Sequence, residues 1–216
     1  MSQPIHIGFL IYPDVTQLDA TGPAEILSRV PGAIIHMVWK TLDPVPSDAG
    51  FSILPTDTFE SCPDLDVLCV PGGMGQAPLM GDEEVLGYLK RQGEQARYVT
   101  SVCGGSLILG AAGLMKGYKA ACHWAFRDLL PTFGAQPVAK RIVVDRNRIT
   151  GGGVTAGIDF GLALAAELAD EDTAKTIQLF VEYDPHPPFD AGTPENAGPE
   201  LEAKARAIFE KARTSA

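Results

Sequence analysis

The stretch YVTSVCGGSLILGAAGLM, from Tyr98 to Met115, contains the pattern that decides the fold. A run of strand-forming residues leads to Cys103, and a glycine-rich apolar helix is predicted from Gly104 to about Ala112. A sharp turn from a strand into a helix is where many enzymes hold a nucleophile. Because Cys103 is predicted at the N-terminus of this helix, the helix dipole and free N–H groups should lower the pKa of its thiol.

Strands and helices alternate on both sides of this stretch, which predicts an α/β protein with a mainly parallel sheet and helices on both faces. Apolar runs predict strands over residues 6–11, 33–40, 51–54, 66–73, 97–102 and 118–124, and a hairpin over 141–150 with its turn at residues 145–147. Helices are predicted from Pro23 with Thr21 as the cap, over residues 82–96, from Val154, and over residues 170–183 with an acidic cap.

The composition is that of a soluble globular protein, and not of a disordered or fibrous one. The chain has 216 residues, 45% of them hydrophobic, and a formal net charge of -10. This charge argues against a nucleic-acid partner, because neutralising phosphates takes clustered Lys and Arg. The N-terminal sequence lacks the basic region and cleavage site of a signal peptide, and the apolar run over 154–169 is too short to span a membrane. We therefore expect a cytoplasmic protein without a membrane partner.

Two parts are expected along the chain. Residues 1–190 are interpreted as one α/β domain, and residues 191–216 as a Pro/Gly-rich segment followed by a C-terminal helix that docks as a tail. The four cysteines have irregular spacing that matches neither a CxxC pair nor a zinc site, so we expect free thiols and no metal.

Ligands of open parallel sheets bind outside the carboxyl ends of the strands, where loops lead into helices. Four such loops are predicted, at residues 12–22, 71–75, 103–106 and 151–155, and three of them are rich in glycine. Glycine lets backbone N–H groups approach a ligand closely. The backbone of five residues is therefore expected to stabilise a thiolate or an oxyanion: Gly72, Gly73, Gly104, Gly153 and Val154. The triple glycine lacks the GxGxxG spacing and the Walker lysine, so no nucleotide cofactor is expected.

Asp19 is the preferred candidate to exchange a proton with the thiol. Its apolar surroundings in QLDATGP should raise the pKa of the carboxyl group toward neutral pH. The alternative is a structural role as a helix cap. His123 is a second candidate, although a histidine beside a tryptophan is as often a packed core residue. The substrate pocket is expected to be lined by Ile11, His123, Trp124 and Thr155.

The segments LDATGP, VPGG, TSVCGGSLILGAAGLMKG, HWAF and TGGGVTAGIDFGLALAAEL occur in the order found in the ThiJ/PfpI superfamily, and within it the chain most resembles the isocyanide (isonitrile) hydratases. The resemblance extends from about residue 5 to about residue 194. It implies a flavodoxin-like three-layer sandwich, a homodimer, and hydration of an isocyanide to an N-substituted formamide without a cofactor.

The resemblance also implies roles for individual residues. Cys103 matches the nucleophile and Asp19 the acid/base carboxylate, while Gly72, Gly73 and Gly104 match the loops around the thiol. The chain departs from similar hydratases at Gly104, where they carry threonine. Thr155 is the candidate to supply the missing hydroxyl group.

Two other functions within the superfamily stay open: a glyoxalase that needs no glutathione, and a redox sensor in which Cys103 is oxidised by peroxide. A peptidase is disfavoured because Gly104, and not a histidine, follows the cysteine. A transcription regulator is disfavoured because the short segment after residue 190 is not basic.

Overall fold

The computed structural model describes residues 3–215 and is built on a seven-stranded sheet with the order β10-β11-β7-β6-β1-β2-β5. Neighbouring strands are parallel except β10 and β11, which form the predicted antiparallel hairpin at one edge. The prediction of a mainly parallel sheet is confirmed. The strands of this sheet are β1 (Ile5–Leu10), β2 (Ala33–Trp39), β5 (Asp57–Thr58), β6 (Val67–Val70), β7 (Tyr98–Val102), β10 (Ile142–Asp145) and β11 (Arg148–Gly151).

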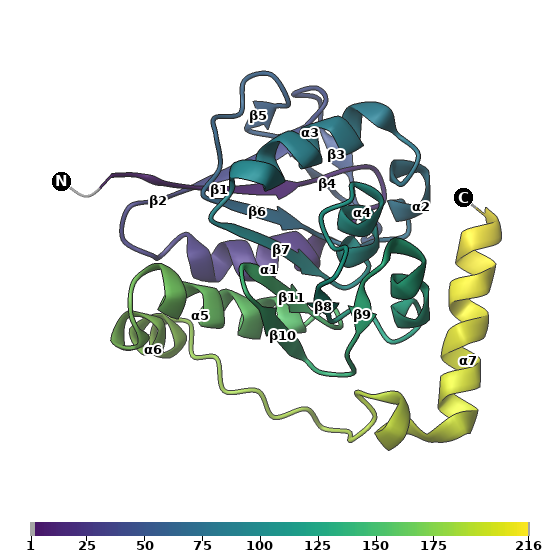
Figure 1. Ribbon diagram of the computed structural model, residues 1–216. Coiled ribbons are helices and arrows are strands. Elements are labelled where there is room, and N and C mark those ends of the chain that lie inside the picture. Colours follow the sequence, from purple (N-terminus) through teal and green to yellow (C-terminus); the bar gives the residue numbers. More distant parts are fainter. Residues whose placement is uncertain (1–2, 216) are drawn as a thin grey trace.

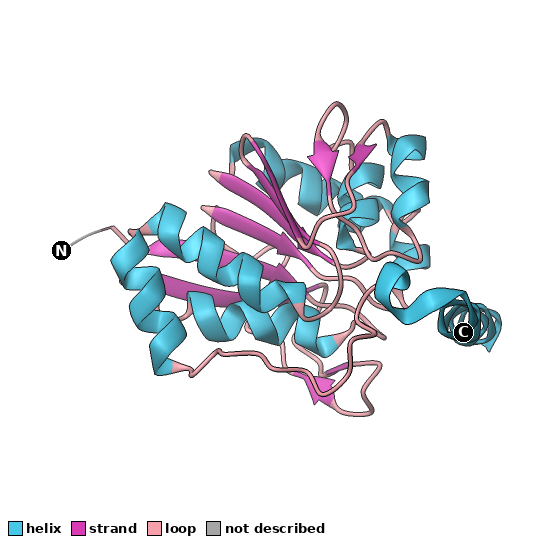
Figure 2. Cartoon of the chain, turned by 90° about the horizontal axis from the view of Figure 1, so that it is seen from below, coloured by secondary structure: helices cyan, strands magenta, loops and turns pink. Residues whose placement is uncertain are grey.

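Helices cover both faces of the sheet and confirm the flavodoxin-like three-layer arrangement (Figure 1, Figure 2). One layer contains α1, α5 and α6, and the other contains α3 and α4. The helices are α1 (Gln17–Leu27), α2 (Gln76–Leu79), α3 (Glu83–Gln95), α4 (Gly105–Ala111), a 3-10 helix (Arg127–Phe133), α5 (Ala156–Leu168), α6 (Glu171–Phe180) and α7 (Pro194–Ser215). Asp170 caps α6 by accepting a hydrogen bond from Thr173 N–H, as predicted.

The central strands supply a hydrophobic core to each face. In and just after β1, Phe9 and Ile11 pack into the core beneath α1 and α5, whereas Leu10 and Tyr12 pack into the core beneath α3 and α4. All four side chains are completely buried. Burial on both faces explains why this stretch is nearly continuous in apolar residues, each large one contributing about 1.5–3 kcal/mol.

The start of α1 differs from the prediction. The helix begins at Gln17 and continues through Pro23, so Asp19 lies in its first turn. Thr21 is not a cap, because its hydroxyl group donates a hydrogen bond to Gln17 one turn earlier in the helix. Pro23 packs closely against Gly157 of α5. Packing between α1 and α5 thus outweighs the missing proline N–H group.

Two predicted strands are shorter than expected. Of residues 118–124 only β8 (Lys119–Ala120) is a strand, paired with β9 (Gln136–Pro137), so His123 lies in a turn. Of residues 51–54 only β4 (Ser52–Ile53) is a strand, and it pairs with β3 (Val45–Pro46) outside the main sheet.

The C-terminal segment returns to the body of the protein. No helix or strand is present from residue 181 to residue 193, and α7 follows from Pro194, near the start of the predicted Pro/Gly-rich segment. Gly198, with φ 78°, interrupts the helical conformation of α7. The ring of Phe209 then packs against the rings of His123 and Trp124. The division at residues 190 and 191 stays a prediction.

Candidate active site

The order of the strands brings the four predicted loops together at one end of the sheet, where the parallel strands have their carboxyl ends. The parallel strands β11, β7, β6 and β1 are neighbours, and each leads at its carboxyl end into one of these loops. The order of the strands reverses at β1, because β2 lies on one side of it and β6 lies on the other. Such a point of reversal is where ligands bind in open α/β sheets.

Cys103 forms a sharp turn between β7 and α4. Its φ angle is 59°, a left-handed conformation that costs a residue with a side chain about 1–2 kcal/mol. Its N–H donates to Gly151 O at 3.1 Å, and its carbonyl oxygen accepts from His123 N–H at 3.2 Å. Neighbouring loops thus hold the strained turn, which is the geometry predicted for a nucleophile.

Asp19 reaches the same place from the first turn of α1. Its side chain is completely buried, and Oδ2 accepts a hydrogen bond of 2.9 Å from Gly72 N–H. Burial raises the pKa of Asp19 from 3.8 to about 7, against the opposing effects of Gly72 and the Cys103 thiol. The predicted direction of this shift is confirmed. The other oxygen, Oδ1, is buried without a regular hydrogen-bond partner among the described residues.

The pKa of Cys103 is raised, and the predicted lowering is wrong. Burial is the main cause, followed by the charges of Asp19 and Cys122. The N–H of Gly104 at the start of α4 donates to the sulfur and acts in the opposite direction, as expected from a helix N-terminus, but it is outweighed. The thiol interacts directly with the carboxyl group of Asp19. The pair can therefore pass one proton between sulfur and oxygen.

Two predicted glycines allow these groups to approach one another. A Cβ atom on Gly72 would lie 2.4 Å from Gly104 N and 3.0 Å from Cys103 Cβ, so only glycine fits there. Gly73 has φ 152°, and a Cβ atom there would lie 2.5 Å from Asp14 O. Gly72 and Gly104 thus contact the nucleophile, whereas Gly73 packs against the loop before α1.

Tyr12 is a residue that the sequence analysis missed. It is completely buried, and its hydroxyl group donates to Pro71 O at 3.1 Å, which joins the loop after β1 to the loop after β6. Burial raises its pKa, and the nearby charges of Asp19 and Cys103 add to the effect. A polar aromatic residue directly after an apolar strand was the available signal.

A cavity of about 380 Å³ contains most of the remaining predicted site residues. It is lined by His123, Trp124, Gly153, Val154 and Thr155, together with residues 192–195 of the C-terminal segment. Cys103 does not line this cavity, but its carbonyl oxygen accepts a hydrogen bond from the N–H of His123, which does.

The surroundings of three predicted pocket residues limit what these residues can do at the site. The Thr155 hydroxyl group accepts hydrogen bonds of 3.3 Å from Arg141, so it is already engaged. Burial lowers the pKa of His123 to about 4, which leaves its imidazole neutral at physiological pH. Ile11 lies completely inside the core that also contains Cys103.

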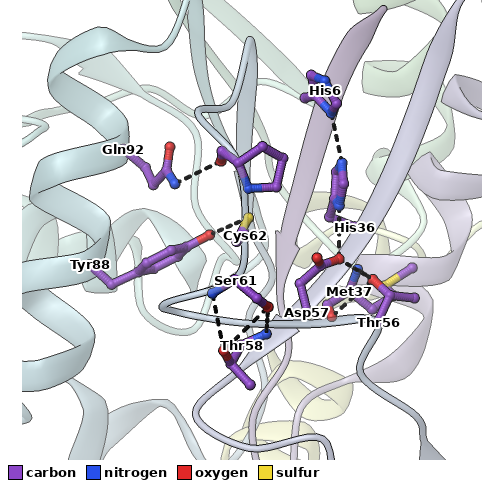
Figure 3. Close-up of polar contacts among 11 residues, drawn as sticks. His6, His36, Met37, Thr56, Asp57, Thr58, Ser61, Cys62, Tyr88 and Gln92 are labelled. Carbon is purple, nitrogen blue, oxygen red and sulfur yellow. Dashed lines mark hydrogen bonds and ion pairs between the residues drawn. The ribbon is translucent and has the colours of Figure 1, made fainter.

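A separate polar cluster lies away from Cys103, on the strands toward the β5 edge of the sheet (Figure 3). His6 Nδ1 lies 2.9 Å from His36 Nε2, and His36 Nδ1 lies 2.8 Å from Asp57 Oδ2. These residues belong to β1, β2 and the edge strand β5, whereas Cys103 follows β7.

No group of three or more His, Cys, Asp or Glu side chains within residues 3–215 is arranged to hold a metal ion. In the same residues, no helix is both long and apolar enough to cross a membrane.

Comparison with known proteins identifies a relative and a solved structure that are similar to most of this chain. The isonitrile hydratase of Pseudomonas putida is 58% identical over 193 residues, which cover 89% of this chain and 85% of that protein. A crystal structure of a ThiJ/PfpI family protein from Pseudomonas syringae is 49% identical, with a TM-score of 0.93 over 99% of this chain and 90% of that one.

In a more distant relative, the matched region makes up only about half of the protein. The HTH-type transcriptional regulator GbdR of Pseudomonas aeruginosa is 30% identical over 190 residues, which cover 82% of this chain but 51% of the regulator. The DJ-1/PfpI family model matches residues 6–167. By its fold, its cysteine turn and these similarities, the chain belongs to the DJ-1/PfpI family.

Proposed function

We propose that the protein hydrates an isocyanide to an N-substituted formamide, with Cys103 as nucleophile and Asp19 as general acid and base. The observation that carries this proposal is the buried pair itself. Asp19, with a pKa raised by burial to about 7, interacts directly with a thiol held in a strained turn. The similarity to an isonitrile hydratase supports the choice of substrate.

The first half of the reaction forms a covalent adduct. Asp19 takes the proton of the Cys103 thiol, and the thiolate sulfur attacks the terminal carbon of the isocyanide. Asp19 returns the proton to this carbon, which gives a thioimidate, S–CH=N–R, and a carboxylate. The N–H of Gly104 donates to the sulfur and thereby stabilises the thiolate before attack.

The second half hydrolyses the adduct. The Asp19 carboxylate takes one proton from water as the water oxygen adds to the thioimidate carbon, and it passes this proton to the nitrogen. Asp19 then takes the hydroxyl proton while the carbon–sulfur bond breaks, which releases the formamide. Return of the proton to sulfur restores the starting pair. Two smaller barriers replace one large barrier, and no external oxidant or reductant is consumed.

The remaining sequence-based expectations belong to this proposal. Gly153, Val154, His123 and Trp124 are proposed to surround the R group of the substrate, because they line the cavity beside Cys103. The homodimer, the cytoplasmic location and the absence of a cofactor stay predictions.

Turnover of cyclohexyl isocyanide tests the proposal, with formamide measured by chromatography for the wild type, Cys103→Ala and Asp19→Asn. We expect formamide from the wild type and a loss of at least about a hundredfold in kcat for each variant. Circular dichroism checks that the variants are folded. An inactive wild type, or a fully active Cys103→Ala, would contradict the proposal.

A further inference from the structure

Gln76 places an unused polar atom beside Gly104, the residue that follows the nucleophile. It is the first residue of α2, directly after the glycine-rich loop that follows β6, and its side chain is buried. Among the described residues, three side-chain oxygens are buried without a hydrogen-bond partner: Asp19 Oδ1, Gln76 Oε1 and Ser101 Oγ. Burying a polar atom without a hydrogen bond costs free energy. A bound water or substrate molecule can provide the hydrogen bond that these oxygens lack within the protein.

The Gln76 amide occupies the space that a side chain at position 104 would need. A Cβ atom on Gly104 would lie 1.7 Å from Gln76 Oε1 and 2.6 Å from Gln76 Cδ. Distances below 3.0 Å are essentially never found for real Cβ atoms, so a side chain at position 104 would require the amide of Gln76 to move. Glycine at position 104 lets the amide of Gln76 reach the backbone that donates to the Cys103 sulfur.

The same contacts connect Gln76 to Asp19. Gly72 N–H donates to Asp19 Oδ2, and the α-carbon of Gly72 packs against Gly104, which in turn contacts the Gln76 amide. Once the sulfur is bound in the thioimidate it carries no proton to donate to Asp19, so Asp19 Oδ1 and Gln76 Oε1, which lies against Gly104, both lack a donor among the described residues. A water molecule has two O–H groups and can donate one to each acceptor.

We propose that Gln76 is a positioning residue whose Oε1 accepts a hydrogen bond from the water that hydrolyses the Cys103 thioimidate. This inference rests on the proposed function. One water O–H donates to Gln76, which fixes the orientation of the water, and the other donates its proton to Asp19 as the oxygen adds to the thioimidate carbon. Gln76 itself neither gains nor loses a proton.

The test separates formation of the adduct from its hydrolysis. Gln76→Met keeps the length of the side chain and removes the amide. After mixing with cyclohexyl isocyanide and acid quenching, intact-protein mass spectrometry follows the adduct, which adds the mass of one isocyanide. We expect the rate of adduct formation to stay within about twofold and the rate of its hydrolysis to fall at least about tenfold, so that the adduct accumulates.

Gln92→Met is the matched structural control. Gln92 is also a buried glutamine, but its amide accepts from Leu65 N–H at 3.1 Å and donates to Pro63 O at 3.0 Å, the latter contact being drawn in Figure 3. We expect this variant to lower the thermal unfolding midpoint and leave both rates unchanged. If Gln76→Met behaves in the same way, or slows both steps equally, the inference is overturned.

A second pair of variants tests the coupling between positions 76 and 104. In a Gln76→Ala background, Gly104→Ser adds a hydroxyl group in the vacated space, whereas Gly104→Ala adds only volume. We expect Gly104→Ser to restore hydrolysis at least about fivefold over Gly104→Ala. Equal rates would overturn the inference. An inactive wild type would instead overturn the proposed function and this inference with it, whereas an active wild type with unaffected variants overturns the inference alone.

Discussion

The proton shared by Asp19 and Cys103 sets the expected pH dependence of the reaction. Burial raises the pKa of Asp19 to about 7, so below this pH the carboxyl group is protonated and cannot take the proton of the thiol. Above it, the carboxylate is available. We therefore expect log(kcat/KM) to rise by about one unit per pH unit below pH 7 and to level off above it. Initial rates between pH 5 and pH 8 measure this. A profile that is flat from pH 5 upward, as for a carboxyl group with an ordinary pKa of about 4, would contradict it.

At the residue scale, the sequence supports the direction of one pKa shift and misleads on the other. The apolar neighbours of Asp19 are visible in the sequence, and they correctly predict a raised pKa. For Cys103 the sequence shows the helix N-terminus, which lowers the pKa of a thiol. It does not show that the sulfur is buried with Asp19 and Cys122 near it, and burial with these neighbours decides the direction.

At the scale of elements, the close approach of the loop after β6 to the start of α4 depends on Gly72. We expect Gly72→Ala to destabilise the fold by about 1–3 kcal/mol, because the new Cβ would lie 2.4 Å from a backbone nitrogen. It should also lower kcat at least about tenfold, because Gly72 N–H holds Asp19. Urea denaturation and turnover measure the two effects.

Gly87→Ala is the matched control for this change. Gly87 lies inside α3, and nothing lies within 4 Å of a Cβ atom built there. The variant should stabilise the protein by about 0.5–1 kcal/mol, because alanine favours a helix over glycine. A destabilised Gly87→Ala, or a Gly72→Ala as stable and active as the wild type, would show that local space does not decide these positions.

The elements themselves were largely predictable, and their boundaries were less so. Apolar runs correctly predicted the strands of the main sheet except the two-residue edge strand β5, and they predicted the helices that cover it and the turn at Cys103. The start of α1 was wrong because Pro23 usually marks a first turn, whereas here it contacts Gly157 of α5. This contact joins residues more than a hundred positions apart, and a local pattern contains no information about it.

At the scale of the whole molecule, α7 is held by an aromatic contact. Phe209 packs against His123 and Trp124, and Arg206 lies over the Trp124 ring. We expect Phe209→Ala to increase tryptic cleavage at Lys204 and Arg206 at least about tenfold, which corresponds to the loss of about 1.4 kcal/mol of docking energy. Ile208→Ala, on the exposed side of the same helix, should leave the cleavage rate unchanged. Equal cleavage of both variants would contradict this account of the tail.

The same contact limits what the sequence could predict about the cavity. Local sequence patterns place His123 and Trp124 near the loops, but the wall formed by residues 192–195 depends on the path of the C-terminal segment. That path contains no strand or helix between residues 181 and 193, so no periodicity indicates it. The position of Gln76 was missed for a similar reason, because the space above Gly104 exists only in the folded protein.

The central claim is that Cys103 becomes covalently attached to the isocyanide carbon during turnover. Rapid acid quenching of the wild type with cyclohexyl isocyanide, followed by peptide mapping by mass spectrometry, tests it most directly. The account predicts that the peptide containing Cys103 gains the mass of one isocyanide molecule while formamide is being produced, and that Cys62, Cys69 and Cys122 stay unmodified. Production of formamide at the same rate by Cys103→Ala, with no modified cysteine in the wild type at any time point, would contradict it.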